Sequence, residues 1–213
     1  RVKTKPAESR RAIRRVVLTG GIATGKSYVL ERFAALGLPT ADADQLAHAA
    51  IAPGGPAWQP IRDQFGSEMF DEQGVVDRSK LGALVFANDS ARTALNKIVH
   101  PHVRVAISEW FTDLERLPSH CFGIVAIPLY YESSRPDTFD RVIVTACQMD
   151  IQLARVKMRG LSPREARLRI DTQLPTDEKV RRADYTIWTD RLPADTGRRV
   201  KEIFEELVAL STS

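Results

Sequence analysis

The sequence predicts a three-layer α/β domain with a parallel sheet of about five strands, and two observations carry this prediction. Short apolar runs alternate along the chain with segments of helical periodicity, which is the order that strand–helix–strand units produce. Two of the runs, residues 122–127 and 141–147, are almost continuously apolar, with Arg141 and Thr145 as exceptions, instead of alternating with polar residues. Such strands are typical of sheets that helices cover on both faces, and right-handed crossovers are then expected to join them.

The composition excludes several classes of protein. Hydrophobic residues make up 43% of the 213 residues and charged residues 27%, and no apolar stretch approaches the roughly 20 residues that cross a bilayer. A membrane-spanning, a collagen-like and a wholly disordered chain are therefore not expected. Residues 1–15 carry seven basic residues against the single acid Glu8, whereas the remaining chain has a net charge of −2. We therefore expect a disordered basic arm over residues 1–12, and no nucleic-acid or membrane partner.

Two cysteines, Cys121 and Cys147, each lie inside an apolar run. Free cysteine is among the most frequently buried residue types, so we interpret both as small core side chains and not as a disulfide or a metal site. The basic arm lacks the apolar segment of a secretory signal peptide. Together these features predict a cytoplasmic protein.

The N-terminal part of the chain predicts a strand, a glycine turn and a helix. The strand covers residues 16–18, and the helical pattern after the glycines stops near residue 36. A weaker strand over residues 38–41 leads to Asp42, which we expect to cap a helix that runs to Ile51. A segment rich in proline and glycine then breaks the chain.

Residues 53–118 have helical periodicity and contain no convincing strand. Asp77 is expected to cap one helix, and Asn88 or Asp89 to cap the next. Because proline lacks the backbone N–H that a helix interior needs, we expect His100-Pro101 to separate this second helix from a longer one that follows. We interpret the segment as a helical insertion into the α/β domain.

The chain after residue 148 is helical and rich in arginine, and Ser162 with Glu165 fits a capping box at a helix start. Residues 185–188 predict a last short strand before an amphipathic C-terminal helix. The predicted organisation is a disordered arm over 1–12, a core domain over 13–52 and 119–213 with a lid over about 149–180, and a helical insertion over 53–118.

Residues 20–27 match the pattern G-x-x-x-x-G-K-[ST] in full, with a strand before the match and a helix after it. Glycine lets the backbone come close enough for several N–H groups to meet triphosphate oxygens, and the helix adds its positive N-terminal end. Lys26 would reach the β and γ phosphates, and the Ser27 hydroxyl would ligate Mg²⁺. The pattern indicates a nucleoside triphosphate but not the acceptor. The residues expected at the nucleotide are Gly20, Gly21, Ile22, Ala23, Thr24, Gly25, Lys26 and Ser27.

Two carboxylates, Asp42 and Asp44, follow the second expected strand. Residues just past the carboxyl ends of parallel strands line the ligand crevice of an α/β sheet. A carboxylate there can accept the proton of an acceptor hydroxyl or hold the water shell of a metal ion, although Asp42 is equally well explained as a helix cap. The sequence has neither the Asn-Lys-x-Asp motif of a switch GTPase nor the strand-terminal acid of a mechanical ATPase.

These residues resemble the opening block of the dephospho-CoA kinases, and the resemblance continues to about residue 188. Many short blocks in the same order are far more specific than the phosphate loop alone. Besides that loop, the blocks are Asp42-Ala43-Asp44-Gln45, Pro53-Gly54, Phe65-Gly66, Asp77-Arg78-Ser79-Lys80-Leu81, Ile98-Val99-His100-Pro101, Pro128-Leu129 with Glu132, Gln152-Leu153-Ala154-Arg155, and Gln173 with Ala183-Asp184-Tyr185.

The resemblance implies a P-loop kinase fold and transfer of the γ-phosphoryl group of ATP to the ribose 3′-hydroxyl of dephospho-CoA, the last step of coenzyme A synthesis. Asp44 matches the family's general base, Lys26 and Ser27 match its contacts to phosphate and Mg²⁺, and Arg155 and Arg159 fall in a segment that resembles a lid over ATP. The catalytic residues implied are Asp44, Lys26 and Arg155, with Arg159 and Tyr28 at the nucleotide. The residues implied at the acceptor are Asp42, Asp44, Arg78, His100, Pro128 and Glu132. The partner expected is this small molecule, with no obligate protein partner.

The chain also departs from the family's pattern. Ala23 and Thr24 replace the commoner Gly-Ser, which the loop tolerates only if position 23 keeps a φ open to a Cβ atom. Trp188-Thr189-Asp190 replaces an ending linked to the adenine pocket, so Trp188 either stacks on adenine or belongs to the core. Two alternatives stay open: another small-metabolite or nucleotide P-loop kinase, and a nucleotide-binding module without turnover.

Overall fold

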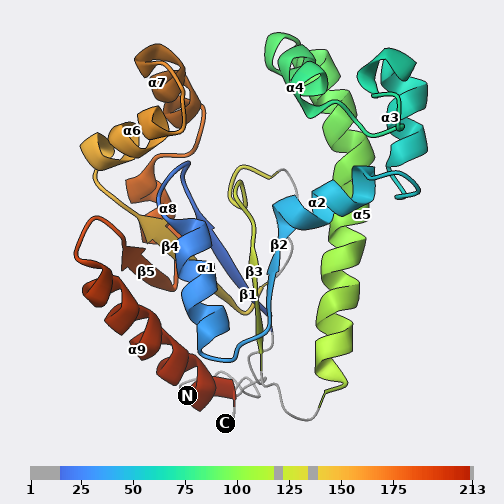
Figure 1. The fold of residues 1–213 in the computed structure, drawn as a ribbon. Helices are drawn as coiled ribbons and strands as arrows, with labels where there is room; N and C mark the ends of the chain where they lie inside the picture. The colour runs from blue at the N-terminus through green and yellow to red at the C-terminus, as the bar shows by residue number, and fades with distance from the viewer. Residues whose placement is uncertain (1–14, 118–121, 134–138, 212–213) are drawn as a thin grey trace, which may run out of the picture. The chain divides into compact units, whose positions relative to one another are not determined.

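The computed structural model describes residues 15–117, 122–133 and 139–211. These residues form two compact units: the first holds the chain up to Thr40 and from Leu114 onwards, and the second runs from Ala41 to Asp113 (Figure 1). Residues 41–52, which the sequence assigned to the core domain, group with the second unit. The basic arm and Cys121 lie outside the described residues.

The first unit is built on a five-stranded sheet, which confirms the predicted α/β fold. Its strands stand in the order β2-β3-β1-β4-β5, and β1 pairs in parallel with both β3 and β4, as β4 does with β5. Adjacent strands therefore need crossover connections, which the intervening helices supply. The strands are β1 (Arg15–Gly20), β2 (Thr40–Asp42), β3 (Gly123–Ala126), β4 (Arg141–Ala146) and β5 (Tyr185–Trp188).

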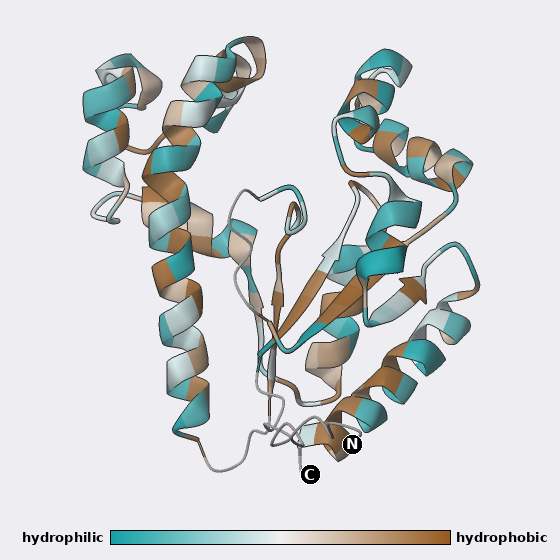
Figure 2. Cartoon of the chain, turned by 180° about the vertical axis from the view of Figure 1, so that it is seen from behind, coloured by the Kyte–Doolittle hydropathy of each residue, from teal (hydrophilic) through white to brown (hydrophobic). Residues whose placement is uncertain are grey.

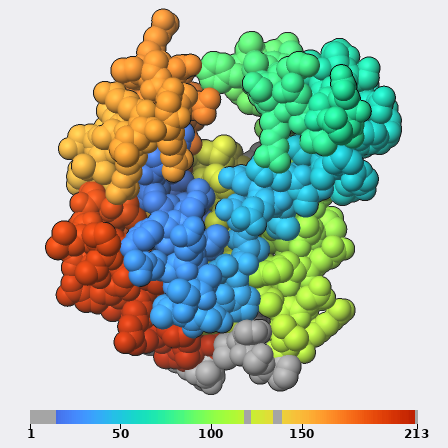
Figure 3. Space-filling model, in the orientation of Figure 1, coloured from blue at the N-terminus to red at the C-terminus, as the bar shows by residue number. Residues whose placement is uncertain are grey.

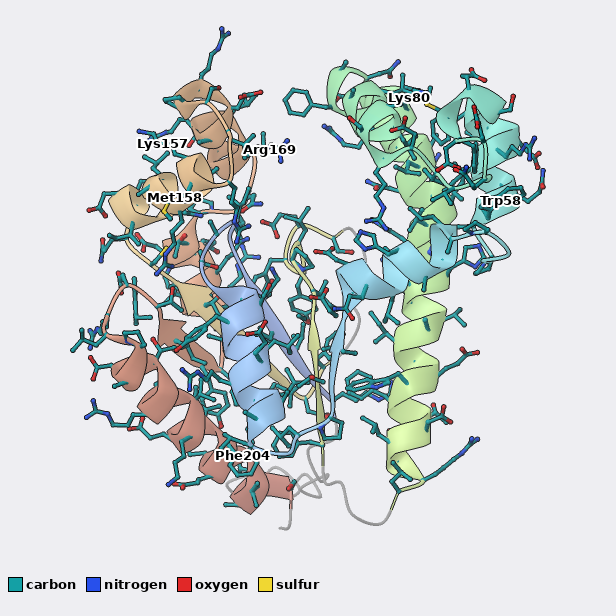
Figure 4. The ribbon with its side chains drawn as sticks, viewed as in Figure 1. Trp58, Lys80, Lys157, Met158, Arg169 and Phe204 are labelled. Atoms are coloured by element: carbon teal, nitrogen blue, oxygen red, sulfur yellow. The ribbon has the colours of Figure 1, made fainter. Side chains whose placement is uncertain are left out.

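The central strands are buried on both faces, as their continuous apolar runs predicted. Every residue of β3 and the last five of β1 are buried, and most of the sheet is coloured as hydrophobic in Figure 2. On one face, Phe33 and Ile203 pack against the strands and belong to the largest core cluster, to which Phe204, labelled in Figure 4, also contributes. The helices of this unit are α1 (Lys26–Ala35), α6 (Met149–Met158), α7 (Pro163–Asp171), α8 (Thr176–Arg182) and α9 (Pro193–Ser211).

The second unit is helical and has its own core. Ile61, Phe70 and Leu81 are buried in it, and the Trp58 ring meets Phe70 edge-on at 5.4 Å between centroids. The Trp58 indole N–H also donates to the Gly74 carbonyl at 2.7 Å, which fixes the turn between helices. Its helices are α2 (Ala43–Ile51), α3 (Trp58–Phe65), the short η1 (Ser67–Met69), α4 (Arg78–Ala87) and α5 (Asp89–Glu115), the last of which continues into the first unit.

The expected break at His100-Pro101 is wrong, because α5 runs through Pro101 without interruption. Proline in a helix interior removes one backbone hydrogen bond and typically costs about 3 kcal/mol. Buried side chains lie on both sides of the proline, Val99 before it and Ile107 and Phe111 after it. Burying a side chain of this kind contributes about 1.5–3 kcal/mol, so packing outweighs the local penalty. The predicted caps are confirmed: Asp77 accepts from the backbone of Ser79 and Lys80, and Asn88 Oδ1 accepts from Ala91 N.

Candidate active site

The phosphate loop connects the carboxyl end of β1 to the first turn of α1, as the sequence predicted. The loop lies so close to β4 that its first residue can only be glycine. A Cβ atom on Gly20 would overlap Thr145 Oγ1 and would lie 2.6 Å from Thr24 Oγ1. Those two hydroxyls are 2.8 Å apart, and Thr24 Oγ1 also bonds the Gly21 carbonyl at 2.8 Å. The sheet and the loop therefore form one hydrogen-bonded unit.

Position 23 of the phosphate loop has a left-handed backbone conformation. Ala23 has a φ of 58°, in the small left-handed region that a residue with a Cβ atom can adopt, so the condition set by the sequence is met only in this uncommon conformation. For a residue with a side chain this conformation costs about 1–2 kcal/mol. The Ala23 methyl is buried in a small cluster with Val156 of α6 and Ala166 of α7, which offsets part of that cost. The loop is thus packed directly against the predicted lid helices, and their surfaces adjoin in Figure 3.

The N-terminus of α1 presents the groups that bind phosphate in proteins. Lys26 and Ser27 are the first two residues of the helix, and Ser27 is exposed. Unpaired N–H groups and the helix dipole make such a terminus attractive to anions. Tyr28 packs partly against the core of the sheet, and its hydroxyl accepts a hydrogen bond from Arg32 at 2.8 Å. Its place beside a nucleotide remains a prediction.

Arg155 binds protein groups on the phosphate loop and after β5. Its guanidinium donates to Thr189 Oγ1 at 2.9 Å, to the Thr189 carbonyl at 2.5 Å and to the Ala23 carbonyl at 3.4 Å. Thr189 in turn donates from Oγ1 to the Thr24 carbonyl at 2.8 Å. The sequence singled out Thr189 as a departure from a family pattern but missed this role. It links the end of β5 to the loop, and Arg155 holds that link in place.

Two glutamines bind the Ile22 residue of the phosphate loop. Gln152 of α6 donates from Nε2 to the Ile22 carbonyl at 2.8 Å, and the Ile22 N–H donates to Gln173 Oε1 at 2.9 Å. Both glutamines belong to blocks that carry the family resemblance, but neither was assigned a role. Nothing in their spacing indicates that two side chains 21 positions apart meet at one residue.

Glu132 lies after β3 in a buried ion pair. Its Oε1 is 2.7 Å from Nζ of Lys179, a residue of α8, and also accepts from the backbone N–H of Leu174 at 2.9 Å. Nζ makes no hydrogen bond of suitable angle to any described residue, so its contact with Glu132 is an ion pair at short distance. Pro128, also after β3, accepts from Thr19 Oγ1 through its carbonyl at 3.2 Å. The carboxylate and this carbonyl both serve contacts inside the first unit.

The predicted lid segment carries its arginines on short helices. Arg159 is exposed and directly follows α6, next to Met158, whose side chain is 87% exposed. Figure 4 labels Met158 and Lys157 on α6 and Arg169 on α7. The Ser162–Glu165 capping box that starts α7 is confirmed, and hydrogen bonds from Ser162 lower the pKa of the Glu165 carboxyl.

A cavity of about 380 Å³ lies within the first unit. Trp188, Cys147 and Met149 line it together with Gln152 and Gln173. Trp188 is half-buried, and its neighbour Ile187 on β5 is buried in the main core, as alternation along a strand requires. Cys147 is a free, buried cysteine, and its burial raises the pKa of its thiol.

The second unit holds the remaining predicted residues. Asp42 caps α2 by accepting from the backbone N–H of Asp44 at 2.8 Å, which places Asp44 in the first turn of that helix. Arg78 is the first residue of α4. His100 lies within α5 and is exposed, and its partial desolvation together with the nearby Arg104 lowers the pKa of its imidazole. The cap predicted for Asp42 is therefore confirmed.

A glycine loop that leads from the central strand of a parallel sheet into a helix beginning Lys-Ser, on the strand order 2-3-1-4-5, defines a P-loop kinase fold. Comparison with known proteins narrows this class. The family model described as dephospho-CoA kinase matches residues 14–193, and the chain belongs to this family.

Named relatives and solved structures agree with this assignment. The dephospho-CoA kinase of Geobacillus kaustophilus is 41% identical over 194 residues, covering 91% of this chain and 96% of that protein. That of Bacillus cereus is 40% identical over 189 residues, covering 88% of this chain and 94% of that protein. The structure of dephospho-CoA kinase from Campylobacter jejuni is 29% identical and covers 90% of this chain and 96% of its own, with a TM-score of 0.68. A shikimate kinase from Bacteroides thetaiotaomicron shares the fold at 15% identity, with 92% and 99% coverage and a TM-score of 0.53.

Proposed function

We propose that this chain transfers the γ-phosphoryl group of ATP to the ribose 3′-hydroxyl of dephospho-CoA, giving coenzyme A and ADP in the last step of coenzyme A synthesis. The observation that carries the proposal is the family match over residues 14–193, which includes a complete phosphate loop. Among the described residues, no helix has both the length and the apolar character needed to cross a membrane. We place the reaction in the cytoplasm, where a free thiol such as Cys147 persists.

The phosphate loop and α1 supply the contacts to ATP in this proposal. Backbone N–H groups and the Lys26 ammonium bind the phosphate oxygens and stabilise the charge that develops during transfer. Ser27 fits a role in holding Mg²⁺, because its hydroxyl oxygen is the kind of donor that this ion prefers and the residue is exposed at the helix start. Mg²⁺ bound there would neutralise charge on the β and γ phosphates. Arg159 is our candidate for an arginine that contacts ATP, while Arg155 fixes the loop.

Asp44 is our candidate for the general base. It lies in the first turn of α2, directly after β2, and a carboxylate that follows a strand of a parallel sheet is placed where it can accept the proton of an acceptor hydroxyl. The acceptor would further be bound by Asp42, Arg78, His100, Pro128 and Glu132. Because the pKa of His100 is lowered, its imidazole is neutral at pH 7 and would act as a hydrogen-bonding group, not as a cation.

Incubation with MgATP and dephospho-CoA tests the proposal directly. We expect coenzyme A and ADP in equal amounts, with the new phosphate on the 3′ position by ³¹P NMR. Nucleosides and small alcohols of other kinases are the control acceptors, and faster transfer to any of them would favour a different P-loop kinase. Binding of ATP without transfer to any acceptor would favour a nucleotide-binding module, and both outcomes contradict the proposal.

A further inference from the structure

Two amide side chains form hydrogen bonds to the phosphate loop, and each can do so in only one orientation. A carbonyl only accepts and an N–H only donates, so Gln152 must turn its NH₂ group and Gln173 its oxygen towards Ile22. Gln152 is 2% exposed, so its hydrogen bond to the loop is largely screened from bulk solvent. We call Gln152 and Gln173 the amide clamp.

The clamp lies close to the loop backbone. A Cβ atom on Gly21 would lie 2.9 Å from Gln152 Nε2 and 3.4 Å from Gln173 Oε1. Any side chain at position 21 would therefore push the amides away from Ile22. Glycine at position 21 therefore lets two protein side chains, and not only a phosphate group, come close to the loop backbone.

The residue that follows the clamped one is Ala23, whose left-handed φ is unfavourable for alanine. The clamp fixes the backbone on the N-terminal side of Ala23. The contacts of its methyl group with Val156 and Ala166 fix the residue itself. Without the clamp, the backbone could relax towards a conformation that alanine prefers, and this would turn the following N–H groups of the loop away from the phosphates.

Gln173 owes its own position to the buried ion pair. Its neighbour Leu174 donates its N–H to Glu132, whose same oxygen pairs with Lys179. Lys179 is 1% exposed, so the cationic member of the pair is shielded from solvent. The segment from Gln173 to Lys179 is thus fastened to the loop at one end and to the chain after β3 at the other.

We propose that Gln152 and Gln173 are positioning residues that hold the phosphate loop in its ATP-binding conformation, with the Glu132–Lys179 pair keeping Gln173 in register. This inference rests on the proposed function for its kinetic readout. Loss of the clamp weakens ATP binding, and binding of dephospho-CoA to the free enzyme is unaffected.

Two substitutions of equal charge and nearly equal shape compare the two hydrogen bonds of the amide clamp. Gln152→Glu replaces the donor to the Ile22 carbonyl by an acceptor, whereas Gln173→Glu keeps an acceptor for the Ile22 N–H. Both add one negative charge beside the same residue, but Gln152 is buried more deeply than Gln173, so an uncharged variant at position 152 is also needed to separate the lost hydrogen bond from the cost of burying a charge. Removing one partner of a buried hydrogen bond costs about 1–3 kcal/mol, so Gln152→Glu should raise KM for ATP about tenfold or more relative to Gln173→Glu. KM for dephospho-CoA should stay within about twofold in both variants.

Gln152→Met provides a second, uncharged variant that keeps the side-chain length and removes the donor. Affinity for ADP, measured by calorimetry, should fall in Gln152→Met and Gln152→Glu and be retained in Gln173→Glu. Equal losses in both Glu variants, or parallel rises in both KM values, would show a charge effect or general damage and overturn the inference. If the wild-type protein makes no coenzyme A, the proposed function fails, yet the ADP affinities still decide whether the clamp positions the loop.

Discussion

The two members of the Glu132–Lys179 pair differ in exposure, so we expect that removing one of them destabilises the protein more than removing the other. The Lys179 side chain is 1% exposed, whereas that of Glu132 is 20% exposed and also accepts from Leu174 N. Removing one partner of a buried ion pair typically costs about 3–5 kcal/mol, since a charge is left buried without compensation. Glu132→Gln leaves the more deeply buried charge, that of Lys179, without a partner, and should lower the free energy of unfolding by about 4–5 kcal/mol. Lys179→Met leaves a carboxylate that keeps a hydrogen bond and some water, and should cost only about 2–3 kcal/mol.

Urea unfolding at pH 7 measures these differences. The double variant Glu132→Gln/Lys179→Met removes both charges, so its stability should return to within about 1 kcal/mol of the wild type. Lys201→Met is the control: its ion pair with Glu205 is exposed and spans 3.8 Å, so the change should stay within about 0.5 kcal/mol. The reasoning is refuted if Lys179→Met costs as much as Glu132→Gln, or if the two losses simply add in the double variant.

Three further substitutions test the site and the fold. Asp44→Asn should lower kcat by about 10²–10⁴ with ADP affinity unchanged, because only the proton acceptor is removed; turnover near the wild-type rate would exclude Asp44 as the base. Ala23→Gly relieves a left-handed φ and should change the free energy of unfolding by less than about 1 kcal/mol, whereas Ala166→Gly in the same cluster should cost about 1.5–2 kcal/mol; equal losses would show that position 23 is not strained. His100 has a folded-state pKa below its unfolded value of about 6.5, so the neutral ring stabilises the fold above that pH, and this contribution is lost as pH falls through the folded pKa. The wild type should therefore lose stability relative to His100→Asn as the pH falls below about 6.5, and parallel urea midpoints for both proteins below that pH would contradict the shift.

The parts of this fold that local chemistry determines were predictable from the sequence. The phosphate loop needs glycine where the backbone approaches other groups, and the caps at Asp42, Asp77 and Ser162 need only a side-chain oxygen beside a helix start. The strands were found from their apolar runs because helices cover both faces of the sheet. In each case the signal lies within a few consecutive residues.

The features that the sequence did not reveal depend on contacts between distant residues. The break expected at Pro101 fails because buried side chains on both sides of it hold α5 together, and the φ of Ala23 is imposed by neighbours in α6 and α7. Lys179 lies in a run of charged residues that is typical of a solvated helix face, yet it is buried against Glu132, which lies 47 positions earlier. Glutamines that bind a loop carry no local signature at all, so the clamp was visible only in three dimensions.

The hydroxyl contact between Thr24 and Thr145 has a consequence for the thermodynamics of nucleotide capture. Because neighbouring strands already immobilise the start of the loop, its ordering entropy is lost when the chain folds and not when a nucleotide arrives. Association of a nucleotide should then be fast and accompanied by a small change in conformational entropy. Differences in affinity between nucleotides should arise mainly from their dissociation rates.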